Sequence, residues 1–203
     1  MSFFNPDNWL WRGFGRLADF FILSALWLLC SIPVVTMGAA SIALYDTVAH
    51  CFRYSEGGMV SRFFRTFKKE LKRGILLTVV WAVIGYLLNV SYQMVTQLGD
   101  GSTFWTVISL ISFVIMVIPV GMACWAIGLE SRFAYSLSQL HKNAAMFTLG
   151  YFPRTLAIVV IFALFYNVVL NLFFMVIFLP AIMVNLQSMI MEPVFRKYMP
   201  EEE

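Results

Sequence analysis

Residues 155–191 read TLAIVVIFALFYNVVLNLFFMVIFLPAIMVNLQSMIM, and none of these 37 residues is charged. Three more stretches without a charge lie earlier in the chain, at residues 20–45, 74–99 and 101–129. A helix needs roughly 20 apolar residues to cross a hydrocarbon core of about 30 Å. A chain of 203 residues is too small to cover four such helices on every side. The sequence therefore predicts an all-α protein, a polytopic transmembrane helical bundle.

The composition agrees with this class. Apolar residues make up 61% of the chain and charged residues 12%, against roughly 45–50% and about 25% in soluble domains. The charges lie between or at the edges of the apolar stretches, so their placement is more informative than the net charge of +3. The three cysteines form no CxxC motif, which favours small buried side chains over a metal site or a disulfide.

The charges of the connecting segments predict the orientation. Residues 50–73 carry seven lysines and arginines against two glutamates, and a short basic loop stays in the cytoplasm. Residues 98–102 read LGDGS, which suits a tight external turn. Residues 130–154 then bring three basic residues back to the cytoplasm.

The last apolar stretch is too long for one crossing, because a single helix of this length would measure about 55 Å. Two short crossings with a turn near Asn167–Asn171 fit the bilayer better. The predicted bundle then has about five membrane helices, over residues 18–46, 74–98, 103–129, 154–170 and 172–191. This count places the C-terminus in the cytoplasm and the N-terminus outside. A broken or re-entrant first helix is the alternative; it would keep the N-terminus, with Arg12 and Arg16, inside.

An amphipathic, basic helix is predicted at about residues 59–73. Apolar side chains at helical spacing form one stripe, and cations cover the rest of its surface. Such a helix can lie in the membrane interface among anionic headgroups, as a topology anchor or as a docking surface for membrane lipids or a cytoplasmic partner. The residues predicted for docking are Arg62, Phe63, Phe64, Arg65, Phe67, Lys68, Lys69, Lys72 and Arg73.

A weak internal repeat places an acid 13, 11 and 12 residues after Pro33, Pro119 and Pro180. Prolines near mid-membrane kink helices, and three kinked helices could frame a cleft; prolines are also simply common in membrane helices. The polar groups near the prolines could instead make interhelical hydrogen bonds of about 0.6 kcal/mol each. The candidate cleft residues are Pro33, Thr36, Gly38, Pro119, Gly121, Pro180, Asn185 and Gln187.

No catalytic constellation is evident in the sequence. His50 and His141 are far apart and have no cluster of cysteines or acids beside them. No phosphate-binding glycine loop occurs, and no acid or base lies inside an apolar stretch. We therefore expect a protein that is not an enzyme, with no cofactor, no metal and no nucleic-acid partner.

Residues 26–40 read LWLLCSIPVVTMGAA and are followed by Ala43-Leu44-Tyr45, then by Glu56-Gly57-Gly58. With the later segments Arg62-Phe63-Phe64 and Phe67-Lys68-Lys69, this pattern resembles the YesL-like family of bacterial integral membrane proteins, a domain of unknown function. The resemblance covers residues 5–195. It implies about five helices in a Gram-positive type plasma membrane and an association with carbohydrate uptake and its two-component regulators. It supplies no catalytic or ligand residues.

Two functional hypotheses follow. The first is a non-enzymatic accessory to carbohydrate uptake or its sensing, which docks importer subunits or a sensor kinase through the basic helix. The second is a small solute-binding or transport protein, with a cleft framed by the proline-kinked helices. A membrane enzyme that acts on lipid has only the interfacial cations in its favour.

Overall fold

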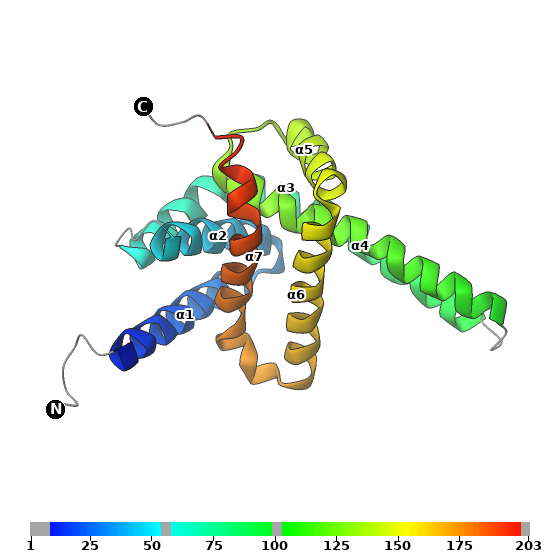
Figure 1. Ribbon diagram of the computed structural model, residues 1–203, viewed down its shortest axis with the longest axis horizontal. Helices are drawn as coiled ribbons and strands as arrows, with labels where there is room; N and C mark the ends of the chain where they lie inside the picture. Colours follow the sequence, from blue (N-terminus) through cyan, green and yellow to red (C-terminus); the bar gives the residue numbers. More distant parts are fainter. Residues whose placement is uncertain (1–8, 54–57, 99–102, 200–203) are drawn as a thin grey trace.

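The computed structural model describes residues 9–53, 58–98 and 103–199. Every regular element in this part of the chain is a helix, so the predicted all-α class is confirmed (Figure 1). The helices are α1 (Trp9–Ser31), α2 (Met37–Arg53), α3 (Met59–Leu98), α4 (Thr103–Arg132), α5 (Leu137–Gly150), α6 (Phe152–Asn171) and α7 (Leu179–Phe195), with short 3-10 turns at Val34–Thr36 and Phe173–Ile177.

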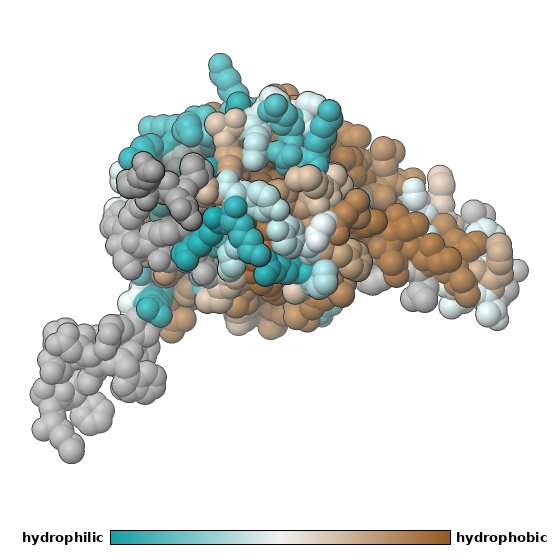
Figure 2. All heavy atoms as spheres, turned by 45° about the horizontal axis from the view of Figure 1, so that its top comes forward, coloured by the Kyte–Doolittle hydropathy of each residue, from teal (hydrophilic) through white to brown (hydrophobic). Residues whose placement is uncertain are grey.

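Four segments are long and apolar enough to cross a membrane: Val34–Phe52, Met59–Val95, Val114–Arg132 and Phe152–Asn171. The helix α7 is apolar but shorter. Large apolar side chains remain exposed along α3, α4 and α6. Figure 2 shows this apolar surface on the arm that projects from the molecule, with hydrophilic residues gathered at the other end. A surface of this kind is expected where lipid tails surround the helices.

The prediction of one helix over residues 18–46 is wrong, because the chain breaks between α1 and α2. Pro33 lies in the break with an extended backbone, at φ −75° and ψ 105°. Proline cannot donate the helical hydrogen bond, and its ring disfavours a helical conformation in the preceding residue. The Thr36 hydroxyl stabilises the break by donating to the carbonyls of Cys30 at 2.6 Å and of Pro33 at 2.7 Å.

The helices α1 and α2 run antiparallel to each other. The rings of Phe20 and Phe52 stack with centroids 4.7 Å apart, and Trp27 Nε1 donates to Ser41 Oγ at 3.1 Å. The middle of α1 therefore lies beside the end of α2, and the end of α1 lies beside the start of α2. This is the broken first helix that the sequence analysis gave as the alternative to one helix over residues 18–46.

The predicted interfacial helix at 59–73 and the predicted span at 74–98 are a single helix, the 40-residue α3. Gly58 precedes it with a φ of +80°, a left-handed conformation that favours glycine. At Gly74 the backbones of α3 and α2 meet, and a Cβ atom there would overlap the backbone of Ala39. The amide of Gly38 donates to Thr78 Oγ1 at 2.8 Å across the same contact. Small residues thus hold the two helices together.

The 37-residue apolar stretch divides close to the predicted turn. The helix α6 ends at Asn171, and α7 begins at Leu179 rather than at the predicted residue 172. Pro180 lies in the first turn of α7, where a missing amide hydrogen leaves no helical bond unmade. It is therefore not the mid-helix kink that the sequence suggests, whereas Pro119 does lie inside α4.

The fold thus consists of three antiparallel helix pairs, α1/α2, α3/α4 and α6/α7 (Figure 1). Along the chain, α5 connects the second pair to the third. The helices α2, α4 and α7 each return from the far end of their pair, and their C-terminal ends meet. Trp125 of α4 anchors the core there, against the rings of Phe147 and Phe195. The predicted external turn at 99–102 and the Glu56-Gly57 part of the predicted glycine turn lie outside the described residues.

The antiparallel α1/α2 pair predicts the membrane topology of the N-terminal segment. In a cysteine-free background, we expect Gly15→Cys in α1 and Gly150→Cys at the end of α5 to react with an impermeant thiol reagent from the same side. Gln97→Cys, at the end of α3, should react from the other side. Labelling of Gly15→Cys from the same side of the membrane as Gln97→Cys would contradict the antiparallel pair.

Candidate functional site

A buried acid stands near the C-terminal end of each returning helix: Asp46 in α2, Glu130 in α4 and Glu192 in α7. They are the acids that follow the three prolines in the sequence repeat. A buried carboxylate is costly unless it is paired and hydrogen-bonded. Each of the three is paired with an arginine from another helix.

Asp46 joins α2 to α3. Its Oδ2 accepts from Arg62 Nε at 3.0 Å and from the Thr66 hydroxyl at 2.7 Å, and its Oδ1 accepts from Arg62 Nη2 at 3.4 Å. His50 Nδ1, one turn along α2, lies 3.0 Å from Oδ1. The carboxylate thus has three partners, and the two-point contact with Arg62 fixes the guanidinium plane.

Glu192 joins α7 to α4 and α2. Its Oε1 accepts from Arg132 Nε at 2.9 Å and from the Tyr45 hydroxyl at 3.3 Å. Both charged side chains are buried, with 1% of Glu192 and 7% of Arg132 exposed. Arg132 Nη1 also lies 3.2 Å from His50 Nε2. His50 thus lies between the Asp46 carboxylate and the Arg132 guanidinium.

A third ion pair joins α3 to the end of α4. Arg73 Nη1 donates to Glu130 Oε1 at 2.9 Å and to the carbonyl of Tyr135 at 3.2 Å. Beside it, Lys69 Nζ lies 3.1 Å from Glu70 Oε1 on the same helix. The three arginine pairs therefore connect α2, α3, α4 and α7 at one polar end of the molecule.

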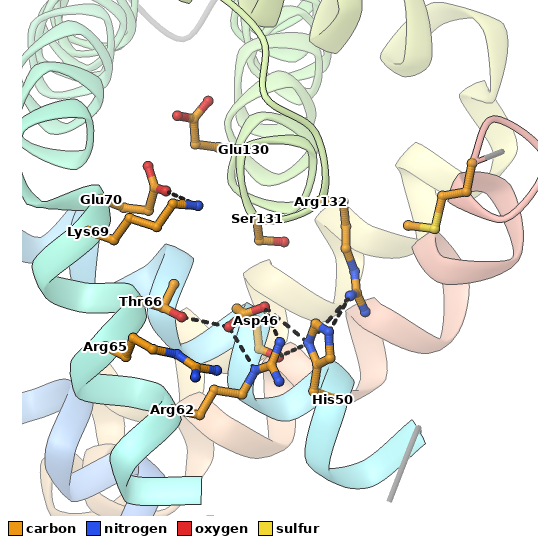
Figure 3. Close-up of a pocket in the computed structure, with 11 residues that line it drawn as sticks. Asp46, His50, Arg62, Arg65, Thr66, Lys69, Glu70, Glu130, Ser131 and Arg132 are labelled. Carbon is orange, nitrogen blue, oxygen red and sulfur yellow. Dashed lines mark hydrogen bonds and ion pairs between the residues drawn. The ribbon is translucent and has the colours of Figure 1, made fainter. Parts of the chain in front are cut away.

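A cavity of about 440 Å³, open on one side, lies over this network (Figure 3). Its walls come from α2, α3 and the end of α4, with one residue from beyond α7. It is lined by Asp46, His50, Arg62, Arg65, Thr66, Lys69, Glu70, Glu130, Ser131, Arg132 and Met199. Within the described residues, no three histidines, cysteines or acids are grouped so that they could hold a metal ion.

Several of the predicted cleft residues pack helices against one another, and none of the predicted cleft residues lines this cavity. Thr36 and Gly38 make the contacts of the α1/α2 break and the α2/α3 crossing. A Cβ atom at Gly121 would overlap the side chain of Thr155 in α6. The Gln187 amide donates to the carbonyl of Ile158 at 3.5 Å. Pro33 is exposed, Pro119 and Asn185 are half-buried, and Pro180 is buried in α7.

The predicted docking residues of α3 fall into two groups. Phe63 is fully buried, Phe67 is half-buried, and the guanidinium groups of Arg62 and Arg73 are held in the ion pairs described above. Phe64 is exposed at the apolar side of the helix. The cations that remain on the outer surface form what we name the cationic ridge: Arg65, Lys68, Lys69 and Lys72.

The sequence analysis missed the ion-paired network, although it carries a signal for it. Asp46, Glu130 and Glu192 follow the prolines at nearly equal spacings, which marks them as equivalent positions. On α3, Arg62 and Thr66 are four residues apart and share one helix face. A buried acid at the end of each apolar stretch needs a cation, and α3 is the most basic helix of the chain.

Comparison with known proteins gives one match. Residues 20–92, roughly a third of the chain, match the model of a family described as "Protein of unknown function, DUF624". This segment holds about half of α1, all of α2 and most of α3, and therefore the Asp46 cluster. No curated protein and no solved structure matched. The chain is thus similar in this segment to a family without an assigned activity.

The burial of the network predicts which charges matter for stability. Asp46→Asn leaves Arg62 without its carboxylate, and we expect it to lower the free energy of unfolding by about 3 kcal/mol. Lys69→Gln breaks an ion pair whose lysine is 78% exposed, and should cost about 1 kcal/mol or less. Thermal unfolding of the purified variants in one detergent checks both. Equal losses would contradict the assignment of Asp46 to a buried network.

Proposed function

We propose that this chain is a multi-pass protein of the bacterial plasma membrane that serves as a non-enzymatic accessory to carbohydrate uptake or its sensing. In this proposal the cationic ridge of α3 binds an acidic surface of a cytoplasmic partner, such as an importer subunit or a sensor kinase. The observation that carries the proposal is the ridge itself. Arg65, Lys68 and Lys72 are exposed and form no ion pair with another described residue.

The arrangement of charges supports docking from the cytoplasm. Exposed cations on α5 and after α7, among them Lys142 and Lys197, add to those of the ridge. Positive charge of this kind is typical of the cytoplasmic side, so we propose that the C-terminus lies there. Clustered exposed cations also attract acidic partners over a Debye length and speed their association.

The link to carbohydrate uptake rests on the resemblance to the YesL-like family. The residues that carry this resemblance lie between Leu26 and Lys69. They fall inside the segment that matches the family of unknown function. Membership of the YesL-like family and the carbohydrate role are therefore proposed together. Asp46, Glu130 and Glu192 are each engaged by an arginine, which favours a structural use of these groups over catalysis.

The alternative of a solute-binding or transport protein has one observation in its favour, the open cavity of about 440 Å³. Its lining is polar and charged, and the three prolines that the sequence suggests as the frame of a cleft do not line it. A sugar importer subunit would need hydrogen-bonding groups that reach its substrate, and here most of the carboxylates are engaged by cations. We therefore place this function second.

Charge reversal on the ridge tests the accessory function. In the full-length tagged protein in its native membrane, Lys68→Glu with Lys72→Glu should abolish co-purification of an importer permease, an importer ATPase or a sensor kinase, and should reduce sugar uptake. Both effects arise because an acidic surface is repelled by the reversed charges.

The matched control is Lys142→Glu with Lys197→Glu, which reverses two exposed cations outside the ridge. This control should keep the partner and the uptake rate, provided that both double variants reach the membrane in equal amounts. Unchanged uptake and unchanged partner recovery in Lys68→Glu with Lys72→Glu would contradict the proposal.

A further inference from the structure

The lining of the cavity between α2, α3 and α4 offers hydrogen-bond donors to a ligand. Its carboxylates already have partners: Asp46 is held by Arg62 and Thr66, Glu130 by Arg73, and Glu70 by Lys69. Arg65 differs from them. Its side chain lines the cavity and makes no hydrogen bond with another described residue. A guanidinium has five N–H donors in a fixed fork. Arg65 can therefore donate hydrogen bonds to a ligand in the cavity, and such donors suit an anion.

The charge of the lining agrees with this chemistry. Four cations line the cavity against three carboxylates: Arg62, Arg65, Lys69 and Arg132 against Asp46, Glu70 and Glu130. The partners that lie outside the lining, Arg73 and Glu192, offset each other. One positive charge is left, and a single negative charge would balance it.

The cavity also lies at the level that lipid phosphate groups occupy in a membrane. The segments that can cross a membrane end at Phe52 and Arg132, within a few residues of His50 and Ser131, which line the cavity. The ends of membrane helices lie at the level of the lipid headgroups. Figure 3 shows Arg65 and Lys69 along one side of α3, with His50 and Ser131 across the cavity.

We propose that this cavity binds a phosphate group, held by the Arg65 guanidinium and the Lys69 ammonium. Arginine binds phosphate through two parallel hydrogen bonds, and lysine adds a point charge. Asp46 has a positioning role, because its contact with Arg62 keeps that second guanidinium at the floor of the cavity. The phosphodiester of an anionic phospholipid carries the single charge that the lining lacks, and it lies at the matching depth.

Two double variants separate a built site from general attraction to anions. Arg65→Gln with Lys69→Gln removes two cations of α3 that line the cavity. Lys68→Gln with Lys72→Gln removes two exposed cations of the same helix that do not line it. All four side chains are on the surface, so both proteins should fold. The single variant Arg65→Lys keeps the charge and loses the two-point hydrogen bonding.

Native mass spectrometry of the delipidated full-length protein in detergent can measure the binding of phosphatidylglycerol, phosphatidylcholine and inorganic phosphate. We expect saturable binding of phosphatidylglycerol, with weaker binding of phosphatidylcholine. Arg65→Gln with Lys69→Gln should weaken it by roughly tenfold or more, Arg65→Lys by less, and Lys68→Gln with Lys72→Gln by about twofold at most.

Inorganic phosphate distinguishes the source of the ligand. If it binds with the same dependence on Arg65 and Lys69 while phosphatidylglycerol does not, the site takes a soluble phosphate. Equal weakening in the two double variants, or saturable binding of neither ligand, would overturn the proposal. Partner docking is tested at Lys68 and Lys72 alone, so either proposal can fail without the other.

Discussion

The structure depends on the pairing of three carboxylates buried at the ends of apolar helices. Asp46 lies in the second half of α2, and Glu130 and Glu192 lie in the last turns of α4 and α7. Burial there is tolerable only if a cation and further hydrogen bonds accompany each acid. The three arginines that do so come from α3 and α4. Pairing therefore holds the consecutive helices α2, α3 and α4 to one another and to the distant α7. The cavity over the network lies where these helices converge.

Helix pairing explains why the polar groups gather at one end. Each apolar stretch is interrupted so that its second helix runs back toward the start of the first, by the break at Pro33, by the connection after Leu98 and by the turn after Asn171. The charged ends then lie together, and apolar surface covers the arm formed by α3 and α4 (Figures 1 and 2). The basic residues of α3 serve two purposes in this arrangement. Those facing inward neutralise the buried acids, and those facing outward form the cationic ridge.

Much of the fold could be predicted from the sequence, because the length of an apolar stretch decides whether it must be divided. The turn near Asn171 and the helix over residues 103–129 follow from that reasoning. The sequence analysis gave the break of the first helix only as an alternative. The continuity of α3 was not predicted, since it depends on contacts between helices, such as the approach of Gly74 to Ala39. The network was missed for the same reason. Sequence spacing marks the acids as equivalent, but their partners become evident only when the helices are packed together.

The central claim is that the end of α4 and the end of α7 are energetically coupled through Arg132 and Glu192. A double-mutant cycle with Arg132→Gln, Glu192→Gln and the double variant measures this coupling directly, from the free energy of unfolding in one detergent. The account predicts that the sum of the two single losses exceeds the measured loss of the double variant by about 1.5 kcal/mol or more, as for other close charge pairs. Additive losses would show that the two charges are not paired in the folded protein and would contradict the account.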